Sequence, residues 1–319
     1  MISFNTDSLR PHERFDHWCE VRGKSLFGVT IELERERRPD FQGRFSAFNI
    51  GEATFAEMKA SSYRVSRTRA DIARVTSNSL YISHQIRGTG WLDVGRDRVH
   101  VMPNNGFGIS HSDMTFIGTP EFSDGFHYRA LKIPLSGDKD LSDNARDLAP
   151  APLFKTDRLT TLISASFTAL ADAGPKPTDD GDAVRHLTQL ALLVRGRVTS
   201  GMPESRAALR FGFYHATRDL IRRNLHRPDL SPAMVADALT ISVRQLHLLF
   251  EPTGTSFART VMTLRLEKAK QLLTADAGQP VSGIAFACGF DSLATFYRAF
   301  RQAFGMTPGD LRFGPQPAE

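Results

Sequence analysis

The 319-residue sequence contains only two cysteines, Cys19 and Cys288, which lie far apart in the chain. This gives neither a disulfide framework nor the spacing of a cysteine metal site, and it is typical of a reducing cytoplasm. No run of about 18 apolar residues is present, so we expect no membrane span. Residues 1–20 lack the apolar core of a secretory signal.

Signatures of common enzymes are also missing. The sequence has no Gly-x-Ser-x-Gly nucleophile elbow, no phosphate-binding loop and no carboxylate pair at a convincing spacing. His84, His100, His111 and His127 fall in the first half, but no His-x-His pair is followed by Glu at a suitable spacing. We therefore expect neither an enzyme nor a bound metal or other cofactor.

Positive charge is concentrated in the last third of the chain. Residues 206–319 contain 14 Lys and Arg against 9 Asp and Glu, which accounts for the whole formal net charge of +5. The first 205 residues therefore carry equal numbers of acidic and basic side chains. This asymmetry indicates a polyanionic partner for the C-terminal part, although a surplus of this size also occurs on surfaces that bind nothing.

The first half has the pattern of an antiparallel β-sandwich or barrel, because short apolar stretches alternate with turns rich in Gly, Pro, Asn and Asp. Within one such stretch, Tyr81, Ser83 and Gln85 alternate with apolar residues, so one face of that strand is expected to be more polar. The predicted strands are 29–33, 45–50, 63–68, 80–86, 98–102, 114–117 and 128–133.

Apolar residues recur at steps of three and four from about residue 157, which predicts helices over 157–172 and 182–196. Gly201 and Pro203 then interrupt the pattern. We therefore expect an α+β protein of two domains. The N-terminal domain, 1–197, is a β-sandwich or cupin-like barrel with flanking helices, 198–206 is a linker, and 207–319 is all-α.

Two segments of the last third, 234–250 and 284–300, resemble each other at an offset of 49 to 50 residues. Each has a short helix with a small residue, a tight turn, and a Ser that can cap a second helix. The pattern predicts two helix-turn-helix modules at about 231–254 and 281–305. In their second helices, Val243, Leu246, Phe250, Leu293, Phe296 and Phe300 are expected to face inward.

These modules and the segment between them resemble the AraC/XylS-type transcriptional regulators. The resemblance covers about 207–313 and includes Arg265-Leu-Glu-Lys-Ala-Lys-Gln-Leu-Leu273, which is similar to the family's helix between the modules. It also includes Ile284-Ala-Phe-Ala-Cys-Gly-Phe290 and Phe300-Arg-Gln-Ala-Phe-Gly-Met-Thr-Pro308. One departure is Thr240, which stands where the family usually has Gly, and a β-branched residue with positive φ is strained there.

The resemblance implies that both second helices enter successive major grooves of double-stranded DNA. Arg244, His247, Thr295 and Arg298 are the expected base readers, and Leu248 and Ala294 the expected contacts to thymine methyl groups. Arg301 and Ser242 are expected to contact phosphates. The resemblance further implies a bacterial, cytoplasmic and nucleoid-associated protein, RNA polymerase as a partner, and activation more often than repression.

The N-terminal half resembles the family's effector-binding and dimerisation domains more loosely. Aromatic residues with His and Gln inside a β-sandwich suit a small-molecule effector of unknown identity. The candidate effector-binding residues are Tyr81, His84, Gln85, Trp91 and His111. The two helices between 157 and 196 are the candidate contact of a homodimer, unless both pack on their own sandwich.

Two other interpretations remain open at this point. One is a cupin-like, metal-dependent enzyme in which the helical third serves for assembly. The other is an architectural DNA-binding protein that responds to no effector. The most favoured hypothesis is a small-molecule-responsive transcriptional regulator.

Overall fold

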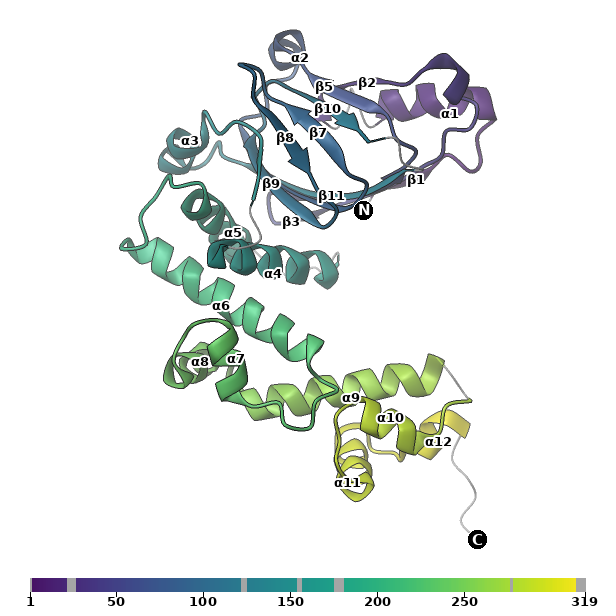
Figure 1. The fold of residues 1–319 in the computed structure, drawn as a ribbon, viewed down its shortest axis with the longest axis vertical. Coiled ribbons are helices and arrows are strands. Elements are labelled where there is room, and N and C mark those ends of the chain that lie inside the picture. Colours follow the sequence, from purple (N-terminus) through teal and green to yellow (C-terminus); the bar gives the residue numbers. More distant parts are fainter. Residues whose placement is uncertain are drawn as a thin grey trace. The chain divides into compact units, whose positions relative to one another are not determined.

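The computed structural model describes residues 2–21, 27–121, 125–153, 157–174, 181–275 and 278–313. The chain divides into two compact units, Met1–Gly212 and Phe213–Glu319. The first is rich in strands and the second is helical (Figure 1). This is the expected α+β fold with a β-sandwich followed by an all-α part.

Two antiparallel sheets form most of the first unit in the described part of the chain. The larger sheet has the order β1-β3-β4-β11-β6-β9-β12 and the smaller has the order β2-β5-β10-β7-β8. The larger contains β1 (Ile2–Asn5), β3 (Gly43–Ile50), β4 (Ala53–Ala60), β6 (Ser79–Arg87), β9 (Gly106–His111), β11 (Phe126–Pro134) and β12 (Ala151–Pro152). The smaller contains β2 (Thr30–Glu32), β5 (Arg64–Arg67), β7 (Gly90–Asp93), β8 (Val99–Met102) and β10 (Phe116–Pro120).

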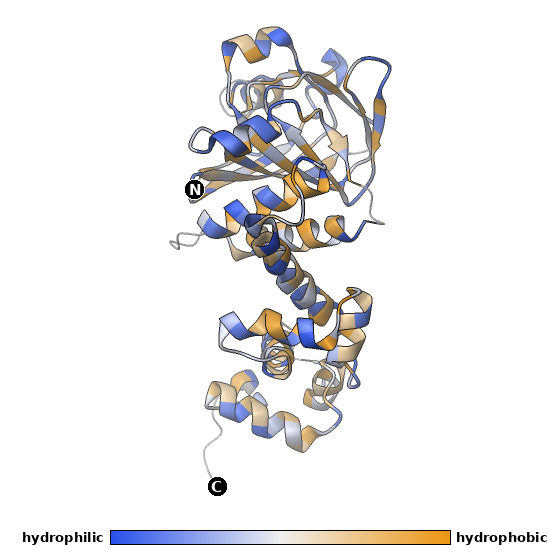
Figure 2. Cartoon of the chain, turned by 90° about the vertical axis from the view of Figure 1, so that its left-hand side faces the viewer, coloured by the Kyte–Doolittle hydropathy of each residue, from blue (hydrophilic) through white to orange (hydrophobic). Residues whose placement is uncertain are grey.

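Helices cover parts of these sheets. Phe167 of α4 (Arg158–Ala173) lies 5.9 Å from Phe55 and 5.5 Å from Phe107, ring centroid to ring centroid, so α4 packs on the larger sheet. Buried apolar residues run along both α4 and α5 (Gly181–Val194), which are prominently hydrophobic in Figure 2. The remaining helices of this unit are α1 (Pro11–Trp18), η2 (Arg35–Arg37), α2 (Arg69–Arg74) and α3 (Lys139–Ala145).

All seven strands predicted from the sequence are present, with ends shifted by a few residues. The prediction missed β1, β4, β7, β9 and β12. Strand β4 contains Ala, Glu, Met and Lys, which favour helices, and it is a strand because it pairs with β3 and β11. Tertiary pairing overrides local propensity there.

The predicted linker at 198–206 is partly wrong, because α6 (Pro203–Arg223) begins inside it. Pro203 interrupts the apolar pattern of the preceding helix, but a proline is tolerated at the first position of a helix, where its missing N–H is not needed. The two compact units divide within α6, between Gly212 and Phe213.

The second unit contains the C-terminal part of α6 and a series of shorter helices. The described ones are α7 (Pro232–Ala238), α8 (Val243–Phe250), η3 (Glu251–Thr253), α9 (Phe257–Ala275), α10 (Val281–Ala287), α11 (Leu293–Phe304) and α12 (Pro308–Phe313). No described helix is by itself long and apolar enough to cross a membrane. Helix α7 and the segment Val243–Thr253 reach that hydropathy only together, and the pair is bent by 102°.

Candidate nucleic-acid interface and ligand cavity

The first helix-turn-helix module consists of α7, α8 and the turn between them. In this turn the amide N–H of Thr240 donates to the Asp237 carbonyl at 2.9 Å, and that of Ile241 donates to the Ala236 carbonyl at 3.0 Å. Thr240 has a φ of 56°, which is the left-handed conformation expected from its place in the turn. The side chain of Thr240 is exposed, and its β-branched side chain carries local backbone strain in this conformation.

The second module consists of α10, α11 and their turn, and it repeats the same backbone bonds. The amide N–H of Gly289 donates to the Phe286 carbonyl at 2.9 Å, and that of Phe290 donates to the Ala285 carbonyl at 3.1 Å. Gly289 has a φ of 85°. Asp291 is an additional residue in this turn, so the offset between the modules rises from 49 before it to 50 after it.

Helix α8 starts with the predicted serine cap. The Ser242 hydroxyl accepts a hydrogen bond from the Gln245 amide at 3.1 Å, and the Gln245 side chain accepts one from the Ser242 amide at 2.9 Å. This reciprocal pair satisfies two donors at the helix start. Leu246 and Phe250 are buried as expected, whereas Val243 is 40% exposed.

Helix α11 has the same design with a simpler cap. The Ser292 hydroxyl accepts a hydrogen bond from the Thr295 amide at 3.4 Å. Phe296 and Phe300 are fully buried, but Leu293 is 37% exposed. The two helices therefore bury corresponding faces, because Leu246 and Phe250 of α8 correspond to Phe296 and Phe300 of α11.

The expectation that Val243 and Leu293 face inward was wrong for both modules. Each is the first residue of its helix. Because helical side chains lean toward the N-terminus, the first side chain lies over the turn and beyond the contact that buries the following residues. The error is therefore systematic, and it adds one apolar residue to each exposed face.

The exposed faces hold nearly all the residues predicted to contact DNA. Thr295 is half-buried, and its contact with a base stays a prediction like the others. Sequence reasoning missed Tyr297, which is 40% exposed and corresponds to His247 at the offset of 50. A residue-by-residue comparison of the second helices of the two modules would have identified Tyr297. The exposed candidates are Ser242, Arg244, His247, Leu248, Ala294, Arg298 and Arg301.

Helix α9 contributes to the cores of both modules. Its first residue, Phe257, lies 6.1 Å from Phe250 of α8, ring centroid to ring centroid. Its later residues Leu266, Ala269 and Leu273 belong to the core formed with α10 and α11. A single helix that packs against both modules suits the helix between the modules that the resemblance implies for Arg265–Leu273.

Helix α9 and the turn of the second module also contact the residues that follow α6. Arg265 of α9 donates from Nε to the Leu225 carbonyl at 3.2 Å and from Nη2 to the Arg227 carbonyl. A Cβ atom at Gly289 would overlap the same Leu225 carbonyl oxygen. Glycine is therefore required there by close backbone approach as well as by positive φ.

The first unit contains a cavity of about 220 Å³ lined by strands of both sheets. Four of the five predicted effector-binding residues line it, namely Tyr81, Gln85, Trp91 and His111. No Asp or Glu is among the described residues that line it. Aromatic side chains dominate the wall, which includes Phe27, Tyr63, Tyr81, Trp91, Phe116, Phe126 and Tyr128.

His84 does not line the cavity, so its assignment to the effector site is corrected. It is buried on the other face of β6, where its ring stacks on Phe107 at 4.1 Å between centroids. Its Nε2 atom lies 2.6 Å from the Asn105 side-chain oxygen. Successive residues of a strand point to opposite faces, so His84 cannot share the face of Tyr81 and Gln85.

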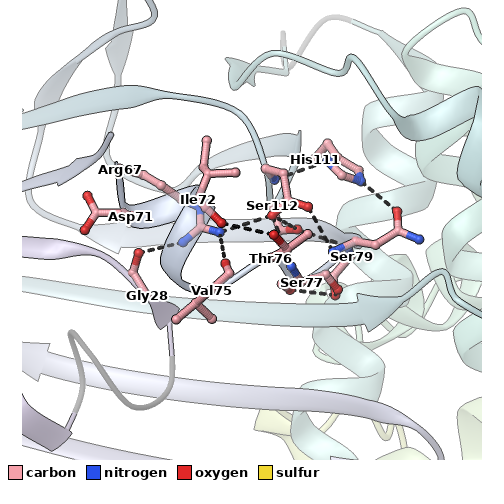
Figure 3. A network of polar contacts seen from close by, with 12 residues as sticks. Gly28, Arg67, Asp71, Ile72, Val75, Thr76, Ser77, Ser79, His111 and Ser112 are labelled. Atoms are coloured by element: carbon pink, nitrogen blue, oxygen red, sulfur yellow. Dashed lines mark hydrogen bonds and ion pairs between the residues drawn. The ribbon is translucent and has the colours of Figure 1, made fainter. Parts of the chain in front are cut away.

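Arg67 of β5 is a cavity residue that sequence reasoning missed. Its side chain is 4% exposed and donates to the carbonyls of Gly28 and Val75 and to the Asp113 carboxylate at 3.1 Å (Figure 3). The only signal for it was its position on a predicted strand, 63–68. Alternation along that strand would have been needed to place its side chain on the inner face.

His111 is held in the neutral form by its surroundings. The amide N–H of Asp113 donates to Nδ1 at 3.1 Å, and Nε2 lies 3.2 Å from the Asn78 side-chain oxygen. Nε2 therefore carries the proton. Burial lowers the pKa of His111, and the Asp113 charge opposes that shift.

The four histidines considered as metal ligands do not converge. His127, for example, contacts Glu57 at 2.5 Å, while His84 stacks on Phe107 and His111 contacts Asn78. In the described ranges no three His, Cys, Asp or Glu side chains lie close enough to share a metal ion.

Two protein-family models match the chain, one in each region of interest. A model described as an AraC-like ligand binding domain matches residues 64–191, which contain most of the cavity. A model described as a helix-turn-helix domain matches residues 235–313, which contain both modules.

Curated relatives show the same likeness over part of their length. The transcriptional activator NphR of a Rhodococcus species is 32% identical over 158 residues, covering 47% of this chain and 45% of the relative. The transcriptional activator RhrA of Rhizobium meliloti is 38% identical over 93 residues, covering 29% and 30%. The chain thus spans less than half the length of these relatives.

A solved structure matches most of the chain. The AraC-like transcriptional activator CuxR matches with a TM-score of 0.50 at 18% identity, covering 90% of this chain and 99% of that one. At this identity the likeness shows the fold alone. The fold is therefore a β-rich domain followed by two helix-turn-helix modules.

Proposed function

We propose that this chain is a sequence-specific DNA-binding regulator that activates transcription in response to a small molecule, in line with the AraC-like ligand binding domain and the helix-turn-helix domain whose family models match its two regions. One observation carries the proposal: two serine-capped helices, α8 and α11, bury matching faces and expose matching faces. A helix of this width fits the major groove of DNA. A duplicated exposed face suits two successive grooves.

Side-chain chemistry assigns roles on the exposed faces. Arg244, His247 and Arg298 present donors that reach base edges, with Thr295 beside them. The Ser242 hydroxyl already accepts a hydrogen bond from Gln245, but its own proton remains available for a phosphate oxygen. The remaining proposed contacts are Leu248 and Ala294 with thymine methyl groups, and Arg301 with a phosphate.

The cavity of the first unit is proposed to bind the effector. Tyr81, Gln85, Trp91 and His111 would contact it there. Effector binding alters DNA occupancy only if the effector binds the DNA-competent state more tightly than the other state. We further propose that the protein is a cytoplasmic homodimer without catalytic activity, that α4 and α5 form the dimer contact, and that RNA polymerase is a partner.

Selection of bound duplexes from a random pool, with the full chain at fixed salt, tests the proposal. We expect enrichment of one site with two contacted stretches about one helical turn, or roughly 34 Å, apart. The variant Arg298→Ala should lose the preference at one base pair, and Lys59→Met, an exposed change on β4, serves as the control. A pool that stays random at physiological salt would refute the proposal.

A further inference from the structure

The second helices of the two modules, α8 and α11, differ in the order of charges along their exposed faces. On α8 the cation is Arg244, in the first turn, and the residue that ends the helix is acidic, Glu251. On α11 the cations are Arg298 and Arg301, and Arg301 lies in the last turn. All four side chains are exposed. The two helices therefore match in the faces that they bury and differ in the charge at their C-terminal ends.

Glu251 occupies the position in the first module that Arg301 occupies in the second, at the offset of 50 residues. Its backbone angles, φ −50° and ψ −48°, continue the helical path of α8. Glu251 therefore lies about two turns beyond Arg244, on the same exposed face. One turn before Glu251, Leu248 stands where the second module has Arg298. The first module thus has an apolar and an acidic residue at the two positions where the second has cations.

The described contacts give the charge of Glu251 no stabilising role. Its carboxylate forms neither a hydrogen bond nor an ion pair with any described residue. A carboxylate at the C-terminal end of a helix also faces the negative end of the helix dipole, which is unfavourable. Arg301, in the last turn of α11, has the favourable sign. The charge of Glu251 is therefore available to act on a partner.

The place of Glu251 at the end of the reading face indicates what it meets on DNA. In helix-turn-helix complexes the N-terminal residues of the second helix contact base edges, and phosphate contacts fix the position of the helix in the groove. Arg301, near the C-terminal end of α11, is the proposed phosphate contact. A carboxylate in the corresponding place on α8 is repelled by phosphates, where a guanidinium would bind them.

We infer that Glu251 limits the DNA affinity of the first module, because its carboxylate faces the sugar–phosphate backbone of the bound duplex where the second module has Arg301. The second module then supplies most of the sequence-independent attraction, and the first adds recognition through Arg244 and His247. A like charge placed against a partner weakens the complex without altering the contacts that read it. The inference rests on the proposed function in taking α8 as a DNA-reading helix.

Two substitutions of Glu251 test this role in the full chain. Binding to the selected duplex and to a random duplex of the same length is measured at several salt concentrations. Glu251→Gln keeps the size of the side chain and removes the repulsion, so it should tighten binding to both duplexes about twofold to fivefold near 0.1 M salt. Glu251→Arg adds a phosphate interaction. It should tighten both about tenfold and steepen the slope of log affinity against log salt by about one unit.

Glu267→Gln is the matched control. It removes one negative charge from an exposed position on α9, outside both second helices. It should change either affinity by less than about twofold and leave the salt slope unchanged, because exposed charges far from the DNA are screened.

Two results would overturn the inference. One is an affinity and a salt slope that both Glu251 variants leave unchanged, because a purely structural role for Glu251 would not move the slope. The other is weaker binding of Glu251→Gln to the selected duplex alone, with a relaxed preference for cytosine. That result would make Glu251 a base reader, since a carboxylate accepts from the cytosine amino group. If Glu251→Arg fails to fold, the isosteric Gln variant still decides between these outcomes.

The random duplex keeps this result separate from the proposed function. A protein that selects a DNA site but binds equally well with either substitution of Glu251 loses this inference and retains the proposed function. A protein that selects no sequence, yet binds the random duplex more tightly with both substitutions, retains the role of Glu251 and loses the proposed function.

Discussion

In the first helix-turn-helix module the turn residue with positive φ is Thr240, whereas in the second it is Gly289. Both turns make the same two backbone hydrogen bonds. The surroundings differ, because Thr240 is exposed while a side chain at Gly289 would overlap the Leu225 carbonyl and crowd Arg265. The comparison separates two demands for glycine: a left-handed backbone, and space for a neighbouring segment of the chain.

The largest effect is expected from Gly289→Ala. The new Cβ must displace the Leu225 carbonyl and is strained at φ 85°. The free energy of unfolding of the second unit should fall by about 2–4 kcal/mol. Urea unfolding of the full chain, followed by hydrogen exchange of peptides from 213–313, measures this change.

Gly254→Ala is the matched control. Gly254 also has positive φ, 64°, but a Cβ there meets no atom within 4 Å. Only backbone strain applies, so the free energy of unfolding should fall by about 1 kcal/mol. Equal decreases for the two glycines would show that close approach contributes nothing at Gly289.

Arg298→Ala compares base reading between the modules. Removing one bidentate pair of hydrogen bonds should weaken binding to the selected site by about 1–3 kcal/mol and relax the preference at one base pair. Titration of labelled specific and random duplexes measures both. Arg244→Ala removes an expected base reader from the first module, and we expect a smaller decrease of specificity there. An equal decrease on specific and random duplexes would remove Arg298 from the base-reading residues.

Arg301→Ala should act on all sequences alike. Without this guanidinium, α11 makes one phosphate interaction fewer, and the slope of log affinity against log salt should fall by about one unit. Binding is measured at several salt concentrations on the selected site and on random DNA. An unchanged slope counts against a phosphate role for Arg301.

The smallest effect is a gain from Thr240→Gly. Removing the Cβ relieves strain at φ 56°, although glycine also makes the unfolded chain more flexible. The net gain in the free energy of unfolding should be about 0.5–1 kcal/mol. The free energy of unfolding of the Thr240→Asn variant should lie between those of the unchanged protein and the Thr240→Gly variant, because Asn tolerates this conformation. A decrease of stability on Thr240→Gly would mean that the first turn carries no strain.

Local signals explain why the modules could be predicted. Ser242 and Ser292 each cap the second helix of a module as expected, since a cap depends on bonds within three residues. Alternation in β6 correctly separated Tyr81 and Gln85 from the buried face. The same rule, applied to His84, would have removed it from the effector site.

Other features depended on contacts between distant segments. Strand β4 is held by its neighbours against its own composition. The start of α6 was missed because a proline that ends one helix and a proline that begins the next look alike in sequence. The exposure of Val243 and Leu293 depends on where the packing of one helix on another ends, which periodicity does not locate.

The sequence by itself determined the two capped modules, the excess of positive charge in the last third, and the alternation of a β-rich first half, because each arises from neighbours along the chain. Only the tertiary structure decided which polar residues share the cavity. Arg67 of β5, Tyr81 of β6 and His111 of β9 line it together because sheet pairing and burial bring separate parts of the chain to one place.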